Sequence, residues 1–110
     1  MPTIYKVLGQ SAPNANTTAN VYTVPASTNT VVSTIVITNR NAGQNTTYRL
    51  AVQPAGAALA NQHFIAYDAA ITALDSVALT MGITLGAADV VSANAGAANL
   101  SFSIFGTEIT

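Results

Sequence analysis

The stretch SVALTMGITL, residues 76–85, places an apolar side chain at every second position. The apolar side chains that share one face are Val77, Leu79, Met81, Ile83 and Leu85. Serine, alanine, threonine and glycine occupy the alternate positions. This period of two predicts a β-strand with one buried face, because a helix would repeat its apolar residues every three to four positions. Such a strand needs partner strands and a second layer to cover its apolar face.

Seven further segments have the composition of strands. Residues 47–53 (TYRLAVQ) and 99–106 (NLSFSIFG) alternate in the same way. Residues 31–39 (VVSTIVITN) are rich in β-branched side chains and apolar on both faces, which is typical of a central strand. The shorter candidates are residues 4–9, 20–25, 63–68 and 89–94. Residues 56–62 and 69–76 are ambiguous, since their alanines and leucines also favour a helical turn.

Turn-forming residues separate these segments. Residues 10–20 form a polar loop, and residues 39–45 join two strands with Gly43 available for a positive φ. Pro54 and Gly56 mark a chain reversal within residues 53–57, and residues 94–99 are expected to close the last hairpin. About eight strands at short spacing predict an all-β fold, a single antiparallel β-sandwich or jelly-roll-like domain over residues 1–110.

The chain is poor in charge. Among its 110 residues, three are Lys or Arg, four are Asp or Glu, and none is cysteine. A typical soluble domain has about a quarter of its residues charged, so two interpretations remain open. The surface is either kept soluble by hydroxyl and amide groups, or covered by other subunits, where charge is depleted. Three basic residues are too few for a nucleic-acid or anionic-membrane partner. Without a cysteine, no disulfide or thiolate zinc site can form.

His63 is the only histidine, and it lies five residues before Asp68. In a strand these two positions point to opposite faces, so they are not expected to form a catalytic dyad. His63 could still meet Asp75 or Asp89 across the fold. Because the serine-nucleophile and phosphate-loop motifs are missing, we expect no enzymatic activity and no catalytic or cofactor-binding residues. A metal site is not expected either, although calcium ligated by carbonyl groups stays open.

Other residues have both a structural and a functional interpretation. Three N-x-[ST] motifs, at Asn16, Asn45 and Asn99, are interpreted as chance matches in a chain rich in Asn, Ser and Thr. The four tyrosines are Tyr5, Tyr22, Tyr48 and Tyr67. They are expected to pack at sheet edges or interfaces, with a sugar-stacking platform as the alternative. Arg49 should lie on an outer sheet surface, with a carboxylate of a neighbouring subunit as an attractive partner.

Six segments in order resemble small structural proteins of tailed bacteriophages, including cyanophages. They are KVLGQSAP (6–13), YTVPAST (22–28), TNRN (38–41), YRLAVQPAGAA (48–58), HFIAYD (63–68) and SFSIFGTEI (101–109). The resemblance implies a non-enzymatic virion component, and it identifies no functional residues. It leaves open whether that component decorates the capsid or belongs to the neck or tail.

The sequence and the resemblance together predict a homo-oligomeric structural protein of the virion, in the first place a capsid decoration protein. It would bind the major capsid protein, or a neck or tail protein, through neutral sheet surfaces. We expect it to be made in the host bacterial cytoplasm, since the N-terminus has no signal-peptide pattern and the chain has no apolar run long enough to span a membrane. The alternative is a neck, tail or fibre component with a receptor- or carbohydrate-binding role.

Overall fold

The computed structural model describes residues 2–110, and all eight expected strands are present. Their bounds are β1 Thr3–Ser11, β2 Thr18–Thr23, β3 Asn29–Asn39, β4 Thr46–Gln53, β5 Phe64–Ile71, β6 Ser76–Leu85, β7 Val90–Ala95 and β8 Leu100–Ile109. Two short 3₁₀ helices, η1 (Pro54–Gly56) and η2 (Asn61–His63), lie in the connection between β4 and β5. The all-β fold is thus confirmed.

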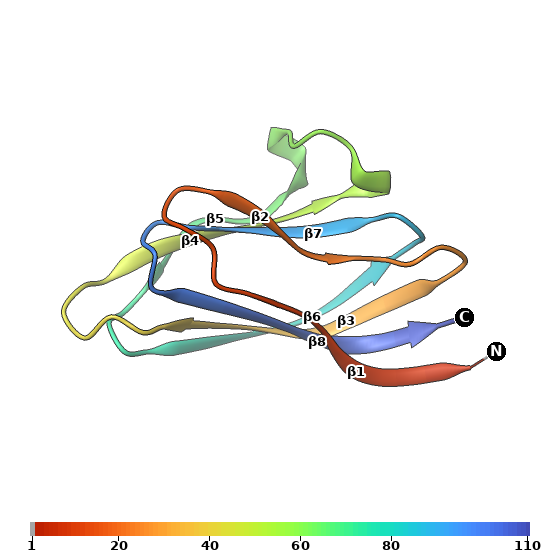
Figure 1. Cartoon of the computed structure of the whole chain (residues 1–110), viewed down its shortest axis with the longest axis horizontal. Coiled ribbons are helices and arrows are strands. Elements are labelled where there is room, and N and C mark those ends of the chain that lie inside the picture. The colour runs from red at the N-terminus through yellow and green to blue at the C-terminus, as the bar shows by residue number, and fades with distance from the viewer. Residues whose placement is uncertain (1) are drawn as a thin grey trace.

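The strands form two four-stranded antiparallel sheets that pack face to face (Figure 1). Sheet A has the order β1-β8-β3-β6, and sheet B has the order β2-β7-β4-β5. The strands pair as in one long hairpin that is folded on itself: β1 with β8, β2 with β7, β3 with β6, and β4 with β5. That hairpin is rolled up so that β8 also pairs with β3 and β7 with β4. This connectivity is a jelly roll.

The connections differ from expectation in three places. Residues 94–99 do not close a hairpin, because β7 belongs to sheet B and β8 to sheet A. Here the turn-forming residues let the chain cross from one sheet to the other. Whether such residues close a hairpin or make a crossing depends on which strands pair on either side of them. Gly56 has the positive φ, of 72°, and Gly43 does not. Residues 69–71 complete β5 instead of forming a helical turn.

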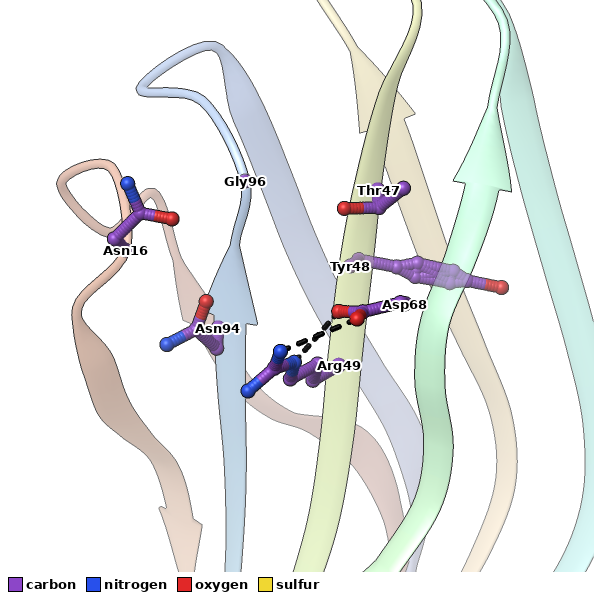
Figure 2. A pocket seen from close by; sticks show the side chains of 7 residues that line it. All are labelled: Asn16, Thr47, Tyr48, Arg49, Asp68, Asn94 and Gly96. Carbon is purple, nitrogen blue, oxygen red and sulfur yellow. Dashed lines mark hydrogen bonds and ion pairs between the residues drawn. The ribbon is translucent and has the colours of Figure 1, made fainter.

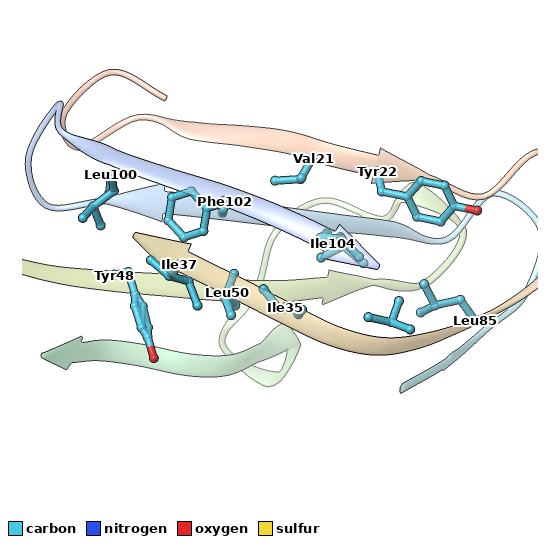
Figure 3. Close-up of a cluster of buried hydrophobic side chains, with 14 of the residues drawn as sticks. Val21, Tyr22, Ile35, Ile37, Tyr48, Leu50, Leu85, Leu100, Phe102 and Ile104 are labelled. Carbon is cyan, nitrogen blue, oxygen red and sulfur yellow. The ribbon is translucent and has the colours of Figure 1, made fainter. Parts of the chain in front are cut away.

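The core lies between the sheets and follows the predicted alternation (Figure 3). Leu100, Phe102 and Ile104 of β8 are at most 1% exposed. Phe102 meets Tyr48 of the other sheet edge to face, with ring centroids 6.5 Å apart. Each fully buried side chain of this size contributes about 1.5–3 kcal/mol. Strand β6 keeps its strict alternation, yet its apolar face is mostly half-buried because β6 is an edge strand.

A row of bulges crosses sheet A. Leu8 is the extra residue where β1 pairs with β8, and Ser33 is the extra residue where β3 pairs with β8. Gly106 of β8 lies beside both, where a Cβ would overlap the carbonyl oxygen of Val31. Bulges bend a strand and increase its twist, and Figure 1 shows β1 changing direction along its length.

The bulge row divides the outer face of sheet A into two halves. On the side of the chain ends, the strand register places a group of apolar side chains together, which we name the apolar corner. Its members are Tyr5, Val7, Val31, Phe105 and Ile109. On the other side the outer face is mainly hydroxyl-bearing, as in the Thr38–Ser76 and Gln10–Ser103 side-chain hydrogen bonds.

Candidate functional site

The outer face of sheet B holds an ion pair between β4 and β5. Arg49 Nε lies 2.6 Å from Asp68 Oδ1, and Arg49 Nη2 lies 3.2 Å from Asp68 Oδ2, so the pair is bidentate (Figure 2). Arg49 therefore lies on an outer sheet surface as predicted. The guanidinium binds a carboxylate of the same chain, and a contact with a carboxylate of a neighbouring subunit stays a prediction. The hydrogen bonds lower the pKa of the Asp68 carboxyl and raise the pKa of Arg49.

A bulge in β5 produces this geometry. The ladder pairs Tyr48 with Ala69 and Leu50 with Ala66, so Arg49 alone lies opposite both Tyr67 and Asp68. Asp68 has a φ of 51°, a left-handed conformation that is uncommon for a non-glycine residue within a strand. Bulges of this kind redirect a side chain, and here the redirected group is a carboxylate facing solvent.

Two aromatic side chains extend the site along β5. The guanidinium carbon of Arg49 lies 4.0 Å from the centroid of the Tyr67 ring, a cation–π contact. Phe64 meets Tyr67 edge to face, with centroids 4.9 Å apart. Tyr67 is 58% exposed. Phe64, Tyr67 and Asn61 line an open hollow of about 460 Å³, which we name the aromatic hollow.

A second, smaller hollow lies on the other side of Arg49, and we name it the polar hollow. It has a volume of about 130 Å³, and its lining is Asn16, Thr47, Tyr48, Arg49, Asp68, Asn94 and Gly96. Figure 2 shows these residues coming from the β1–β2 loop, β4, β5, β7 and the segment after β7, with Tyr48 directed away from Arg49. The Asn94 amide donates a 3.2 Å hydrogen bond to Thr18, which orients the amide on the sheet.

His63 is not part of this site. It ends η2 and is only 8% exposed, and its Nδ1 accepts a 3.0 Å hydrogen bond from the backbone N–H of Ala60. The prediction that residue 63 begins a strand was wrong by one residue. Asp75 and Asp89 accept backbone hydrogen bonds within turns. In residues 2–110 the structure brings together no group of three or more His, Cys, Asp or Glu side chains.

A buried polar cluster connects the two sheets at the end near the chain termini. The Tyr22 hydroxyl donates to Glu108 Oε2 at 2.6 Å and lies 2.8 Å from the Thr30 hydroxyl. Lys6 Nζ lies 3.1 Å from Glu108 Oε1. Burial, followed by the contact with Glu108, raises the pKa of Tyr22 to about 12. The hydrogen bond from Tyr22 lowers the pKa of Glu108.

This cluster was missed from the sequence, although a signal was present. Leu100, Phe102 and Ile104 point inward at every second position of β8. The same spacing leads through position 106 to Glu108, which is therefore also expected to point inward. The structure leaves Glu108 only 8% exposed. A carboxylate at an inward position needs partners, because burying an unpaired charge is strongly unfavourable. Here the hydroxyls and the ammonium group provide them.

The four tyrosines divide into two pairs. Tyr22 and Tyr48 are buried in the core between the sheets, which differs from the predicted packing at sheet edges or interfaces, and burial raises the pKa of Tyr48. Tyr5 and Tyr67 are 81% and 58% exposed and lie on different sheets. They therefore do not share one stacking platform.

The remaining polar candidates have local roles. Arg40 donates to the carbonyl oxygen of Ala98 at 3.3 Å. Asn45 accepts a 3.0 Å hydrogen bond from the backbone of Ala73. Of the three N-x-[ST] asparagines, Asn16 alone lines the polar hollow.

The apolar corner is the second candidate surface. It includes part of β1, which is an edge strand of sheet A. Within residues 2–110 no strand pairs with the outer side of β1. Tyr5 and Val7 are 81% and 48% exposed, and Ile4 on the opposite face is 51% exposed. Both faces of this half of β1 are therefore open to solvent. An apolar edge strand of this kind is a ready surface for association with another chain.

Comparison with known proteins adds no relative: no protein-family model matches the chain, and no curated protein matches it significantly. In residues 2–110 the structure has no helix that is long and apolar enough to cross a membrane.

Proposed function

We propose that this protein is a non-enzymatic structural component of a bacteriophage virion, in which it decorates the capsid. The observation that carries the proposal is the open edge of β1, where Ile4, Tyr5 and Val7 are exposed on a molecule with few charged residues. Proteins normally protect such an edge with charge, proline, a bulge or a covering segment. Here Lys6 is turned to Glu108 in an ion pair and Leu8 is a bulge, and the apolar side chains of the strand still stay exposed. A neighbouring subunit would cover it and would gain about 25 cal/mol per Å² of apolar surface, before the entropic cost of association.

Two features support the virion setting. Eight-stranded jelly rolls are common in viral capsid proteins, although this architecture also serves lectins and enzymes, so it supports the proposal only by analogy. The resemblance of six sequence segments to small proteins of tailed phages points the same way. The partners under this proposal are further copies of the chain and the major capsid protein.

The test is quantitative mass spectrometry of purified phage particles, combined with sedimentation velocity of the free protein. Capsid decoration predicts on the order of hundreds of copies per particle, as repeated occupation of a closed shell requires. The double variant Tyr5→Ser/Val7→Thr should lose self-association or incorporation and still fold, since both side chains are exposed. Absence of the chain from purified particles would overturn the proposal.

A second placement, at the neck, tail or fibre with a receptor-binding role, is favoured by the outer face of sheet B. The redirected Asp68 and the exposed Tyr67 have no evident part in the packing of the sandwich. A small copy number, set by the symmetry of the neck or tail, would support this placement over capsid decoration.

A further inference from the structure

The outer face of sheet B has the properties of a small-ligand surface and not of a packing surface. Its centre is the Arg49–Asp68 pair, which lines the polar hollow, while Tyr67, which contacts Arg49, lines the aromatic hollow. The β1–β2 loop, β4, β5 and β7 all contribute side chains to the polar hollow, so the fold itself brings these groups together (Figure 2). Convergence of a few polar groups beside aromatic side chains is the general pattern of ligand sites.

The groups are held in place before any ligand arrives. Asp68 fixes Arg49 from one side through two hydrogen bonds, and the Tyr67 ring contacts its guanidinium at 4.0 Å. Phe64 in turn supports Tyr67. Asn94 is oriented by Thr18 through its amide nitrogen, which leaves its carbonyl oxygen as an acceptor. A pre-organised site loses less entropy when it binds a ligand.

The charge balance of the site selects the class of ligand. Arg49 and Asp68 neutralise each other, and the remaining lining groups of the polar hollow are amides, a hydroxyl, glycine and the tyrosine that points away. A fully charged ligand would break the ion pair and gain little. Hydroxyl groups both donate and accept, so they match spare guanidinium N–H groups, carboxylate oxygens and amide groups together. An apolar C–H face would lie against Phe64 and Tyr67.

We propose that this face of sheet B binds a neutral saccharide. Two hydroxyls of one sugar unit bind the Arg49–Asp68 pair and Asn94 in the polar hollow, and a neighbouring unit packs on Tyr67 and Phe64 in the aromatic hollow. The site is open and shallow, so the dissociation constant for a single sugar should be on the order of 1 mM. This inference does not rest on the virion role, since the same surface would bind sugar on a free protein.

The test is an array of neutral and anionic glycans probed with the full chain, followed by NMR titration of the chain with the best neutral oligosaccharide. The expected result is binding of neutral glycans, with shift changes confined to the backbone amides around Arg49, Tyr67, Asp68 and Asn94. Asp68→Asn keeps the shape of the side chain and should weaken binding about tenfold or more, as loss of a charged hydrogen-bond partner does. Tyr67→Ala should have a similar effect.

Leu74→Ala is the control, because Leu74 is an exposed apolar side chain that lines neither hollow, and this change should leave glycan binding unchanged. Circular dichroism and thermal unfolding check that each variant is folded. Binding of anionic glycans alone, shift changes outside the named residues, or no bound glycan would overturn the inference. None of these outcomes bears on the copy number in particles, so the saccharide site and the virion role fail separately.

Discussion

The Tyr22 hydroxyl donates a 2.6 Å hydrogen bond to Glu108 Oε2 and thereby connects β2 of sheet B to β8 of sheet A. Since its proton is used in this bond, the Thr30 hydroxyl donates to the Tyr22 oxygen. The two sheets are otherwise held mainly by apolar packing. The contact with Glu108 gives their relative position a defined geometry and a dependence on pH.

Replacing Glu108 by glutamine should reduce the sensitivity of the fold to acid. The pKa of Glu108 is lowered below its ordinary value of 4.5, so the folded state binds fewer protons than the unfolded chain. The resulting stability is present above pH 4.5 and is lost as the pH falls through the folded-state pKa. Urea unfolding from neutral pH to about pH 3 measures this slope.

Glu108→Gln should also lower the free energy of unfolding at neutral pH by about 1.5–3 kcal/mol, the range for a hydrogen bond to a charged group. Asp68 contributes to the acid slope as well, so Asp68→Asn is the comparison variant. An acid slope in Glu108→Gln equal to that of the unmodified chain would contradict the assignment.

At the alkaline end, Tyr22 should make the fold sensitive to base. Its pKa is raised from 10.0 to about 12, which means that folding disfavours the phenolate. This stability is complete below pH 10 and is lost as the pH rises through about 12. Ultraviolet titration of phenolate absorbance should show a late-titrating tyrosine that is missing in Tyr22→Phe. An unchanged titration curve in that variant would show that the late group is another tyrosine.

Gly106→Ala should destabilise the chain by about 1–3 kcal/mol, the usual range for overpacking. A Cβ at this position would overlap the Val31 carbonyl oxygen, at the point where the bulge row crosses β8. Gly82→Ala is the control, because a Cβ there meets no atom within 4 Å. Thermal unfolding of both variants measures the difference, and equal stability of the two would contradict the close approach.

Asn39→Ala should cost about 1–3 kcal/mol, because it removes several hydrogen bonds that a buried side chain makes to the backbone. Asn39 is 1% exposed, donates to the carbonyl oxygen of Gln44 at 2.9 Å, and accepts from the backbone N–H of Asn41 at 3.0 Å. Asn45→Ala removes a comparable loop contact at an exposed position, where water can replace it, and should have a smaller effect. Chemical unfolding of the two variants gives the comparison.

The alternation in residues 76–85 and 100–104 was enough to predict strands with one buried face, because successive side chains of a strand point to opposite faces of the sheet. It was not enough to predict which strands pair. Residues 94–99 have the composition of a hairpin turn but cross between sheets, since pairing depends on contacts far away in the sequence.

The candidate site was less predictable than the fold, for the same physical reason. The position of Arg49 on an outer face followed from alternation, whereas its partner Asp68 did not. The bulge at Asp68 breaks the period of two. It follows from the register between β4 and β5, which the sequence of β5 alone does not reveal. A bulge shifts every later side chain to the other face, so one extra residue decides which groups converge.

The position of β8 between β1 and β3 has a consequence for synthesis on the ribosome. The strand that completes the centre of sheet A leaves the exit tunnel after the other seven, and its ladder joins Thr3 to Ile109. Sheet A can therefore close only after translation has passed its final strand. Folding dominated by such distant pairings takes about milliseconds to seconds. During that interval the nascent β1 and β3 present unpaired backbone N–H and C=O groups beside exposed apolar side chains, a state that is prone to association with other chains.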